Sequence, residues 1–231
     1  MTTAFLTVWG IYTAYALLRN LRGRDGFSLT AQLLQTALVL FAIYWLWTNG
    51  KLTRYLWSPV DVGAGLASGH LLFILALAIT HQHPGDVAGH AVDLRGITAF
   101  VLENPETALR FLGVAVIEEM VYRGTAQDIL LTLWGRPLPA IGITALFFCL
   151  LHSHFFRNGV VSALEFALFT VMIGIMYYYT SSLTLVILVH TVRNVESAYL
   201  DYCVSMEDTA TKPERRVCQA CPPAASVVEF L

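Results

Sequence analysis

Residues 160–180 read VVSALEFALFTVMIGIMYYYT, an apolar run interrupted by one carboxylate and a few small polar side chains. A bilayer core needs about 20 mostly apolar residues per helix, so this run predicts a helix that crosses a membrane. Comparable runs recur along the chain and predict an all-α, polytopic transmembrane bundle of about seven spans, within a range of six to eight. The predicted spans are 3–19, 29–48, 64–81, 107–123, 138–156, 160–180 and 183–202, with a partial interfacial element at 126–134.

The composition also indicates a membrane protein. Hydrophobic residues make up 56% of the 231 residues and charged residues only 13%, whereas soluble domains carry about 25% charged residues. So little charge cannot cover a globular surface in water, which excludes an ordinary soluble enzyme and a disordered chain. The net charge of −2 provides no general basic field. We therefore expect the lipid bilayer, and no nucleic acid, as the surroundings of the chain.

Polar segments separate the predicted spans. Residues 81–105 form a long polar link, and residues 203–231 form a polar tail that we expect to be poorly ordered. With seven spans, the basic residues of the first loop and of the tail lie on one side, which we expect to be cytoplasmic. These basic residues are Arg19, Arg22, Arg24, Lys212, Arg215 and Arg216.

Two adjacent carboxylates and an arginine lie in the least hydrophobic predicted span. Glu119 and Arg123 are four residues apart and can pair on one helix face, whereas Glu118 points about 100° away. One carboxylate can then stay ionised while the other transfers protons. The same residues also suit a helix end at the membrane interface, with solvated carboxylates and an arginine that extends to the headgroups. The motif alone leaves both interpretations open.

Two further motifs place histidines in apolar runs at one-turn spacing. Phe148 and His152 share a helix face, and so do His190 and Asn194. Taken singly, each motif also suits polar side chains that hold neighbouring helices together. Ionisable groups at membrane depth are expensive and usually functional. In combination, the three motifs predict one polar pocket. This pocket contains a base that can take a proton from water and hydrogen-bond donors that can stabilise an oxyanion.

These motifs resemble the signature of the CPBP family (CAAX proteases and bacteriocin-processing enzymes, also called Abi), which includes the Ras-converting CAAX endopeptidases. The signature residues are Glu118-Glu119-xxx-Arg123, Phe148-xxx-His152 and His190-xxx-Asn194, in this order. The likeness covers about residues 105–200. With it, the chain divides into N-terminal transmembrane helices and loops (1–104), a CPBP-like catalytic core in the C-terminal half (105–202) and the tail (203–231).

The resemblance implies an intramembrane endopeptidase of the glutamate type, which hydrolyses a peptide bond in a membrane-associated protein or peptide. It implies that Glu118 is the general base that activates water and that His152 helps to hold this water. It further implies that His190 and Asn194 form the oxyanion hole.

Two more residues are implied to support this site. Glu119 and Arg123 would be supporting residues, with Glu119 positioning His152 or another partner. No cofactor is expected. The alternative is a zinc-dependent metalloprotease in which Glu118, His152 and His190 are the metal ligands.

Two other functions stay open. Some members of the family are associated with bacteriocin self-protection, so the chain can be a non-proteolytic immunity protein or scaffold. Buried Glu and His also suit a transporter or proton relay, although the inverted repeats typical of transporters are not found in the sequence. We expect a multi-pass integral membrane protein, in the inner membrane if bacterial and in the endoplasmic reticulum if eukaryotic. The oligomeric state and the substrate are not readable.

Two weaker patterns suit metal binding or no function at all. The first is a loop whose side chains either bind a metal ion or are simply solvated. The second is a Cys-x-x-Cys pair in the tail. The loop residues are His81, His83, Asp86, His90 and Asp93, and the tail cysteines are Cys218 and Cys221.

Overall fold

A computed structural model describes residues 2–24, 26–51, 58–80 and 84–210. In this part of the chain the regular secondary structure is helical and no strand occurs, as the sequence predicts. The helices are α1 (Thr2–Leu21), α2 (Leu29–Thr48), α4 (Pro59–Thr80), α5 (Pro84–Val92), α6 (Leu94–Glu103), α7 (Pro105–Val121), the π-helix η1 (Tyr122–Gln127), α8 (Asp128–Trp134), α9 (Pro137–Leu151), α10 (His154–Arg157), α11 (Gly159–Thr180) and α12 (Leu183–Ala210).

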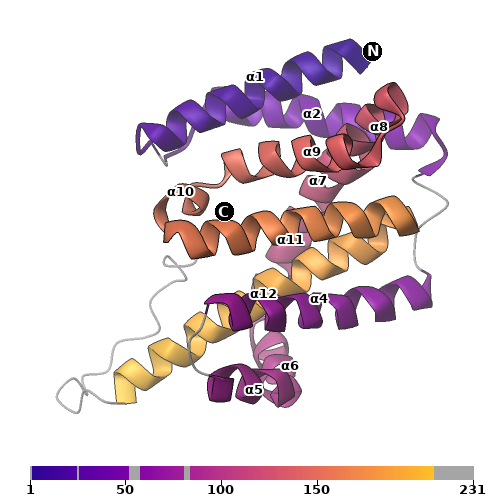
Figure 1. Cartoon of the computed structure of the whole chain (residues 1–231). Helices are drawn as coiled ribbons and strands as arrows, with labels where there is room; N and C mark the ends of the chain where they lie inside the picture. The colour runs from indigo at the N-terminus through magenta and orange to yellow at the C-terminus, as the bar shows by residue number, and fades with distance from the viewer. Residues whose placement is uncertain (1, 25, 52–57, 81–83, 211–231) are drawn as a thin grey trace.

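The long helices lie side by side and form one bundle (Figure 1). α1 packs on α2 and α9, α9 packs on α11, and α12 packs on α4, α7 and α11. α7 passes across the other helices, behind α11 and α12 in Figure 1, and leads into η1 beside α2, α9 and α11. Because α7 contacts both α2 and α12, it connects the N-terminal helices to the last helix.

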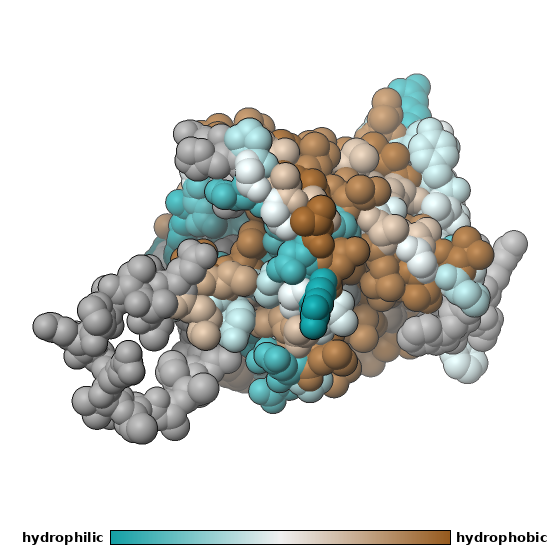
Figure 2. Space-filling model, turned by 90° about the horizontal axis from the view of Figure 1, so that it is seen from below, coloured by the Kyte–Doolittle hydropathy of each residue, from teal (hydrophilic) through white to brown (hydrophobic). Residues whose placement is uncertain are grey.

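Three helices are long and apolar enough to cross a membrane by length and composition, namely α2, α4 and α11, while α9 is apolar but shorter. Every predicted span contains helical residues. The helices of the other predicted spans, however, are not both long enough and apolar enough to cross a membrane by the same criterion, so the number of spans stays a prediction. Large apolar side chains are exposed along these helices. Apolar residues also cover much of the face seen in Figure 2, around a central group of hydrophilic residues. Exposed apolar surface of this extent indicates an integral membrane protein.

Glycines allow α4 to approach α12 closely. A Cβ atom placed on Gly69 would lie 2.7 Å from the Cβ atom of Val192. One placed on Gly65 would lie 2.9 Å from the carbonyl oxygen of Leu185. The two buried glycines are four residues apart, so they form a smooth strip on one face of α4. This contact fixes the position of α12, the helix that carries the third motif.

We predict that Gly69→Ala destabilises the protein by about 1–3 kcal/mol, because the added methyl group has no room against α12. Thermal unfolding in detergent measures this change. Gly63→Ala is the matched control on the same helix, since a Cβ atom there meets nothing within 4 Å. Equal unfolding temperatures of the two variants would contradict the close α4–α12 contact.

The segment 81–105, predicted as a long polar link, contains α5 and α6 instead. Asp93 caps α6 by accepting a 3.0 Å hydrogen bond from the Gly96 amide, and it also accepts one from the Tyr199 hydroxyl on α12. Phe100 of α6 packs on Tyr199 with ring centroids 5.7 Å apart. The polar composition of this segment hid these helices, because short helices are stabilised mainly by tertiary packing.

The hydrogen bond from Tyr199 is the main cause that lowers the pKa of Asp93 below its ordinary value. A carboxyl group with a lowered folded-state pKa stabilises the fold above its unfolded pKa, and this contribution is lost as the pH falls through the folded-state pKa. We predict that Tyr199→Phe raises the pKa of Asp93, so that α5 and α6 loosen at a higher pH during acidification. Hydrogen exchange of residues 84–103 as a function of pH measures this. Tyr202→Phe, on the same helix, should leave the profile unchanged.

A buried carboxylate also joins three helices on this side of the bundle. Glu196 of α12 is 2% exposed, and its two oxygens lie 2.9 Å from His70 Nδ1 on α4 and 3.0 Å from His90 Nε2 on α5. His70 Nε2 lies 3.2 Å from the carbonyl oxygen of Ala91. Both ring nitrogens of His70 therefore face oxygen atoms of the protein. The cluster braces α5 against α4 and α12.

The last helix is longer than the sequence predicts. α12 continues through Ala210, past the predicted start of the polar tail at residue 203. The remainder of the predicted tail, with Cys218 and Cys221, lies outside the described residues.

Candidate functional site

The two glutamates of the first motif lie near the end of α7, where the helix changes its winding. α7 continues into the π-helix η1, and every residue of η1 is buried. Arg123 Nη2 donates a hydrogen bond to the carbonyl oxygen of Thr170 over 3.2 Å. Gln127 Nε2 donates a hydrogen bond to the carbonyl oxygen of Gly174 over 2.8 Å. These bonds fasten η1 to α11 at two successive turns. Short π-helical turns of this kind frequently occur at functional sites.

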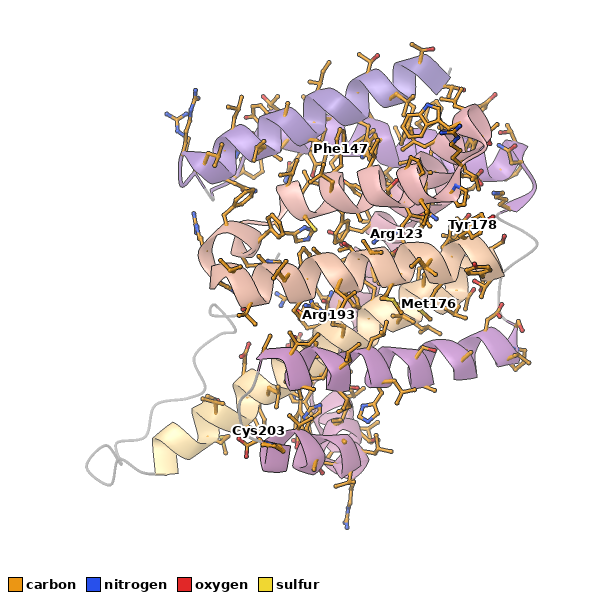
Figure 3. All side chains as sticks on the ribbon, viewed as in Figure 1. Arg123, Phe147, Met176, Tyr178, Arg193 and Cys203 are labelled. Carbon is orange, nitrogen blue, oxygen red and sulfur yellow. The ribbon has the colours of Figure 1, made fainter. Side chains whose placement is uncertain are left out.

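Glu119 and Arg123 form a buried pair, as the four-residue spacing predicts. Glu119 is 0% exposed and Arg123 is 1% exposed, and Arg123 Nε lies 3.2 Å from Glu119 Oε2. The angle does not suit a hydrogen bond, so the attraction is mainly coulombic. The Arg123 guanidinium also lies 4.7 Å from the centre of the Phe148 ring. The motif is therefore not a solvated helix end (Figure 3 shows Arg123 between α9 and α11).

The partner of Glu119 on another helix is His190. His190 Nδ1 of α12 donates to Glu119 Oε1 over 2.8 Å, and His190 is 4% exposed. This bond fixes the orientation of the imidazole ring. It also directs Nε2 toward Glu118, whose Oε2 lies 3.6 Å away.

His152 reaches the site because α9 ends immediately before it. Its backbone is extended, and its amide bonds to the Cys149 carbonyl oxygen over 3.1 Å. Its ring nitrogen Nδ1 donates to the Phe148 carbonyl oxygen over 2.8 Å. The other nitrogen, Nε2, lies 3.8 Å from Glu118 Oε1. The residue is therefore a helix cap with a fixed ring, and it does not continue the helix as the predicted span 138–156 requires.

Glu118 lies between the two histidines. Its side chain is 21% exposed, and its carboxylate oxygens face Nε2 of His152 and Nε2 of His190. Separations of 3.6–3.8 Å are too long for good direct hydrogen bonds. They suit polar groups that share a water molecule. Glu118 Oε2 is buried and makes no hydrogen bond within the described residues.

Two cavities meet at Glu118 and His152. The first, which we call the polar cavity, has a volume of about 30 Å³, and the second, the lateral cavity, has about 330 Å³. The polar cavity is lined further by the polar residues His154, His190, Arg193, Asn194, Ser197 and Asp201, and by the apolar residues Phe111, Val114, Phe166 and Ala198. The lateral cavity is lined further by Tyr12, Gln35, Leu38, Ile117, Tyr122 and Leu151.

The structure thus brings Glu118, His152, His190 and Asn194 to one place, from α7, the end of α9 and α12. Asn194 follows His190 by one helical turn and lines the same polar cavity. Glu119 contacts His190, and its expected role in positioning His152 or another partner stays a prediction.

Sequence reasoning missed an ion pair beside the site. Arg193 Nη2 donates to Glu165 Oε2 over 2.9 Å, and its guanidinium lies 4.4 Å from the centre of the Phe169 ring. Figure 3 shows Arg193 next to α11. The single carboxylate in the apolar run 160–180 was the available signal, since a buried acid needs a partner.

The loop for which the sequence leaves open both metal binding and ordinary solvated side chains shows no metal-binding group among its described residues. Of its members, His90 pairs with Glu196 and Asp93 pairs with Tyr199, while His81 and His83 lie outside the described part of the chain. Nowhere in that part do three or more His, Cys, Asp or Glu side chains form a group suited to hold a metal ion.

Comparison with known proteins finds a similarity to a protein family over part of the chain. Residues 101–195 match the family model described as type II CAAX prenyl endopeptidase Rce1-like. The matched segment contains every predicted site residue, but it contains neither α1, α2 nor α4. No curated protein and no solved structure matches the chain.

Proposed function

We propose that the chain is an intramembrane endopeptidase for a prenylated, membrane-associated protein, because residues 101–195 match the family model of Rce1-like type II CAAX prenyl endopeptidases. The family is one of proteases, and the chain is rich in apolar helices that suit a bilayer. One observation carries the proposal. The Glu118 carboxylate faces Nε2 of His152 and Nε2 of His190 at 3.8 and 3.6 Å, beside a cavity large enough for water.

In this proposal, Glu118 is the general base. A water molecule between Glu118 and His152 gives a proton to the carboxylate while its oxygen attacks the peptide carbonyl carbon. His152 holds this water through Nε2, because its Nδ1 is already bonded to the Phe148 carbonyl oxygen. The proton on Glu118 then passes to the leaving amine as the C–N bond breaks.

His190 and Asn194 are proposed to stabilise the oxyanion. In this proposal His190 carries a proton on each ring nitrogen, and its Nδ1–H group donates to the buried Glu119 carboxylate. The Nε2–H group and the Asn194 side-chain amide can then both donate to the developing negative charge. Arg123 compensates the charge of Glu119, so the pair supports His190 without contacting the substrate.

The proposed chemistry needs no metal ion. Glu118, His152 and His190 surround a space where a water molecule can be held by two hydrogen bonds. In the zinc alternative, the same residues would hold the ion and the bound water would have a lowered pKa.

The experiment uses the purified full chain in proteoliposomes and a peptide that ends in a farnesylated cysteine followed by three residues. We expect release of the C-terminal tripeptide, identified by mass spectrometry, and equal rates with and without a strong zinc chelator. Absence of cleavage by the wild-type protein would contradict the proposed function. Loss of cleavage in the chelator, restored by added zinc, would establish the metal-dependent alternative instead.

A further inference from the structure

We propose that water and substrate reach Glu118 through different cavities, and that α1 and α2 determine which substrates fit. This inference rests on the proposed function and adds the two routes to it. The polar cavity would admit the hydrolytic water, and the lateral cavity would admit the substrate segment with its apolar group. Glu118 and His152 line both cavities, so the water and the peptide carbonyl would meet between them.

Size separates the two cavities. The polar cavity, at about 30 Å³, has room for about one or two water molecules. The lateral cavity, at about 330 Å³, falls in the range of pockets that hold organic ligands. Only the lateral cavity therefore has room for a peptide side chain or a lipid group without rearrangement of the helices.

The lateral cavity opens sideways from the bundle. Its rim includes Gln35 on α2 and Ile117 on α7, and both residues are exposed. α2 is one of the helices long and apolar enough to cross a membrane. An opening beside α2 thus faces the lipid, from which a membrane-anchored substrate arrives. Leu38 and Leu151 supply an apolar wall for its hydrophobic group.

The lateral cavity contains the polar side chain of a buried tyrosine. Tyr122 is 3% exposed, and its ring packs edge-on against Trp9 of α1 with centroids 5.9 Å apart. Together with Tyr12 on α1 and Gln35 on α2, Tyr122 offers hydrogen bonds to an extended peptide backbone beside the apolar wall.

The polar cavity leads in another direction, along α12. Ser197 lies in its wall and Asp201 lies at its exposed end, two to three turns beyond His190. Arg193 and His154 make its sides hydrophilic. Arg193 is held in place by Glu165 and the Phe169 ring. The route thus connects the catalytic residues to the polar end of α12.

α1 and α2 lie outside the segment that matches the family. The residues proposed for catalysis lie within that segment, but Tyr12, Gln35 and Leu38 do not. Substrate choice would thus be set by a part of the chain that the family model does not cover, and the chemistry by the part that it does.

The first test locates the substrate directly. The farnesylated peptide carries a benzophenone group in its prenyl chain and is irradiated with the Glu118→Gln variant in proteoliposomes. We expect cross-links to α1 and α2 around Tyr12, Gln35 and Leu38. Cross-links around Ser197 and Asp201, or no specific cross-links although the wild-type protein cleaves the peptide, would overturn the proposal. Cross-linking itself does not depend on cleavage, so it separates a failure of the inference from a failure of the proposed function.

The second test separates the two routes by kinetics. Gln35→Trp narrows the lateral cavity and should raise KM at least about tenfold with little change in kcat. Ser197→Leu obstructs the polar cavity and should lower kcat at least about tenfold with little change in KM. The matched controls are Gln32→Trp and Ser205→Leu, which add the same bulk to exposed positions of the same helices. If Ser197→Leu changes KM as Gln35→Trp does, water and substrate share one route and the proposal is wrong.

Discussion

Glu118→Gln should lower kcat for cleavage of the farnesylated peptide by roughly 10²–10⁴-fold, the usual contribution of a general base. The amide has nearly the same shape as the carboxylate but cannot accept the proton of the attacking water. KM should change little, because Glu118 contacts the substrate mainly in the transition state. Initial rates measured over a range of peptide concentrations give both constants.

The control for this variant is Glu106→Gln, an exposed glutamate in the first turn of the same helix. It should retain wild-type kcat. Both variants should keep the unfolding temperature of the wild type, since Glu118 is not part of the buried ion pair. A folded Glu118→Gln protein that cleaves at the wild-type rate would remove Glu118 from the mechanism.

Arg123→Met should destabilise the protein by about 3–5 kcal/mol, the usual effect of removing one partner from a buried ion pair. Glu119 is 0% exposed, and its carboxylate would lose the guanidinium and keep the hydrogen bond from His190. The bond to the Thr170 carbonyl oxygen, which fastens η1 to α11, would be lost as well. Thermal or denaturant unfolding in detergent, followed by circular dichroism, measures the change.

The double variant Glu119→Gln, Arg123→Met tests the cause of this loss. It removes the carboxylate charge together with the guanidinium, so it should be more stable than Arg123→Met alone. Arg95→Met, at an exposed position on α6, should change the free energy of unfolding by no more than about 0.5 kcal/mol. If Arg123→Met is as stable as Arg95→Met, the ion pair does not hold η1 in place.

The sequence predicts the helices because hydrophobic length is a strong local signal. The apolar runs at 29–48 and 160–180 agree closely with α2 and α11. The four-residue spacing also predicts the Glu119–Arg123 pair, since helix geometry alone places these side chains together. The number of spans does not follow from the same signal, because charged residues in α7 and α12 lower their mean hydropathy.

The details of the candidate site depend on tertiary structure and could not be predicted from spacing. The apolar run 138–156 predicts one continuous helix. It gives no sign that α9 ends at Leu151 and that His152 caps the helix. The choice of His190 as the partner of Glu119 requires the packing of α12 against α7. The lateral cavity combines residues of α1, α2, α7 and α9, and no sequence motif joins them.

The measurement that tests the central claim most directly is an experimental structure of the wild-type protein at high resolution, with anomalous data collected at the zinc edge. The account predicts one density peak without anomalous signal, about 2.7–3.0 Å from Glu118 Oε1 and His152 Nε2, as for a hydrogen-bonded water molecule. An anomalous peak about 2.0–2.1 Å from Glu118, His152 and His190 would show a zinc site instead. Side chains of Glu118 and His152 that point to separate surfaces would likewise contradict a water activated between them.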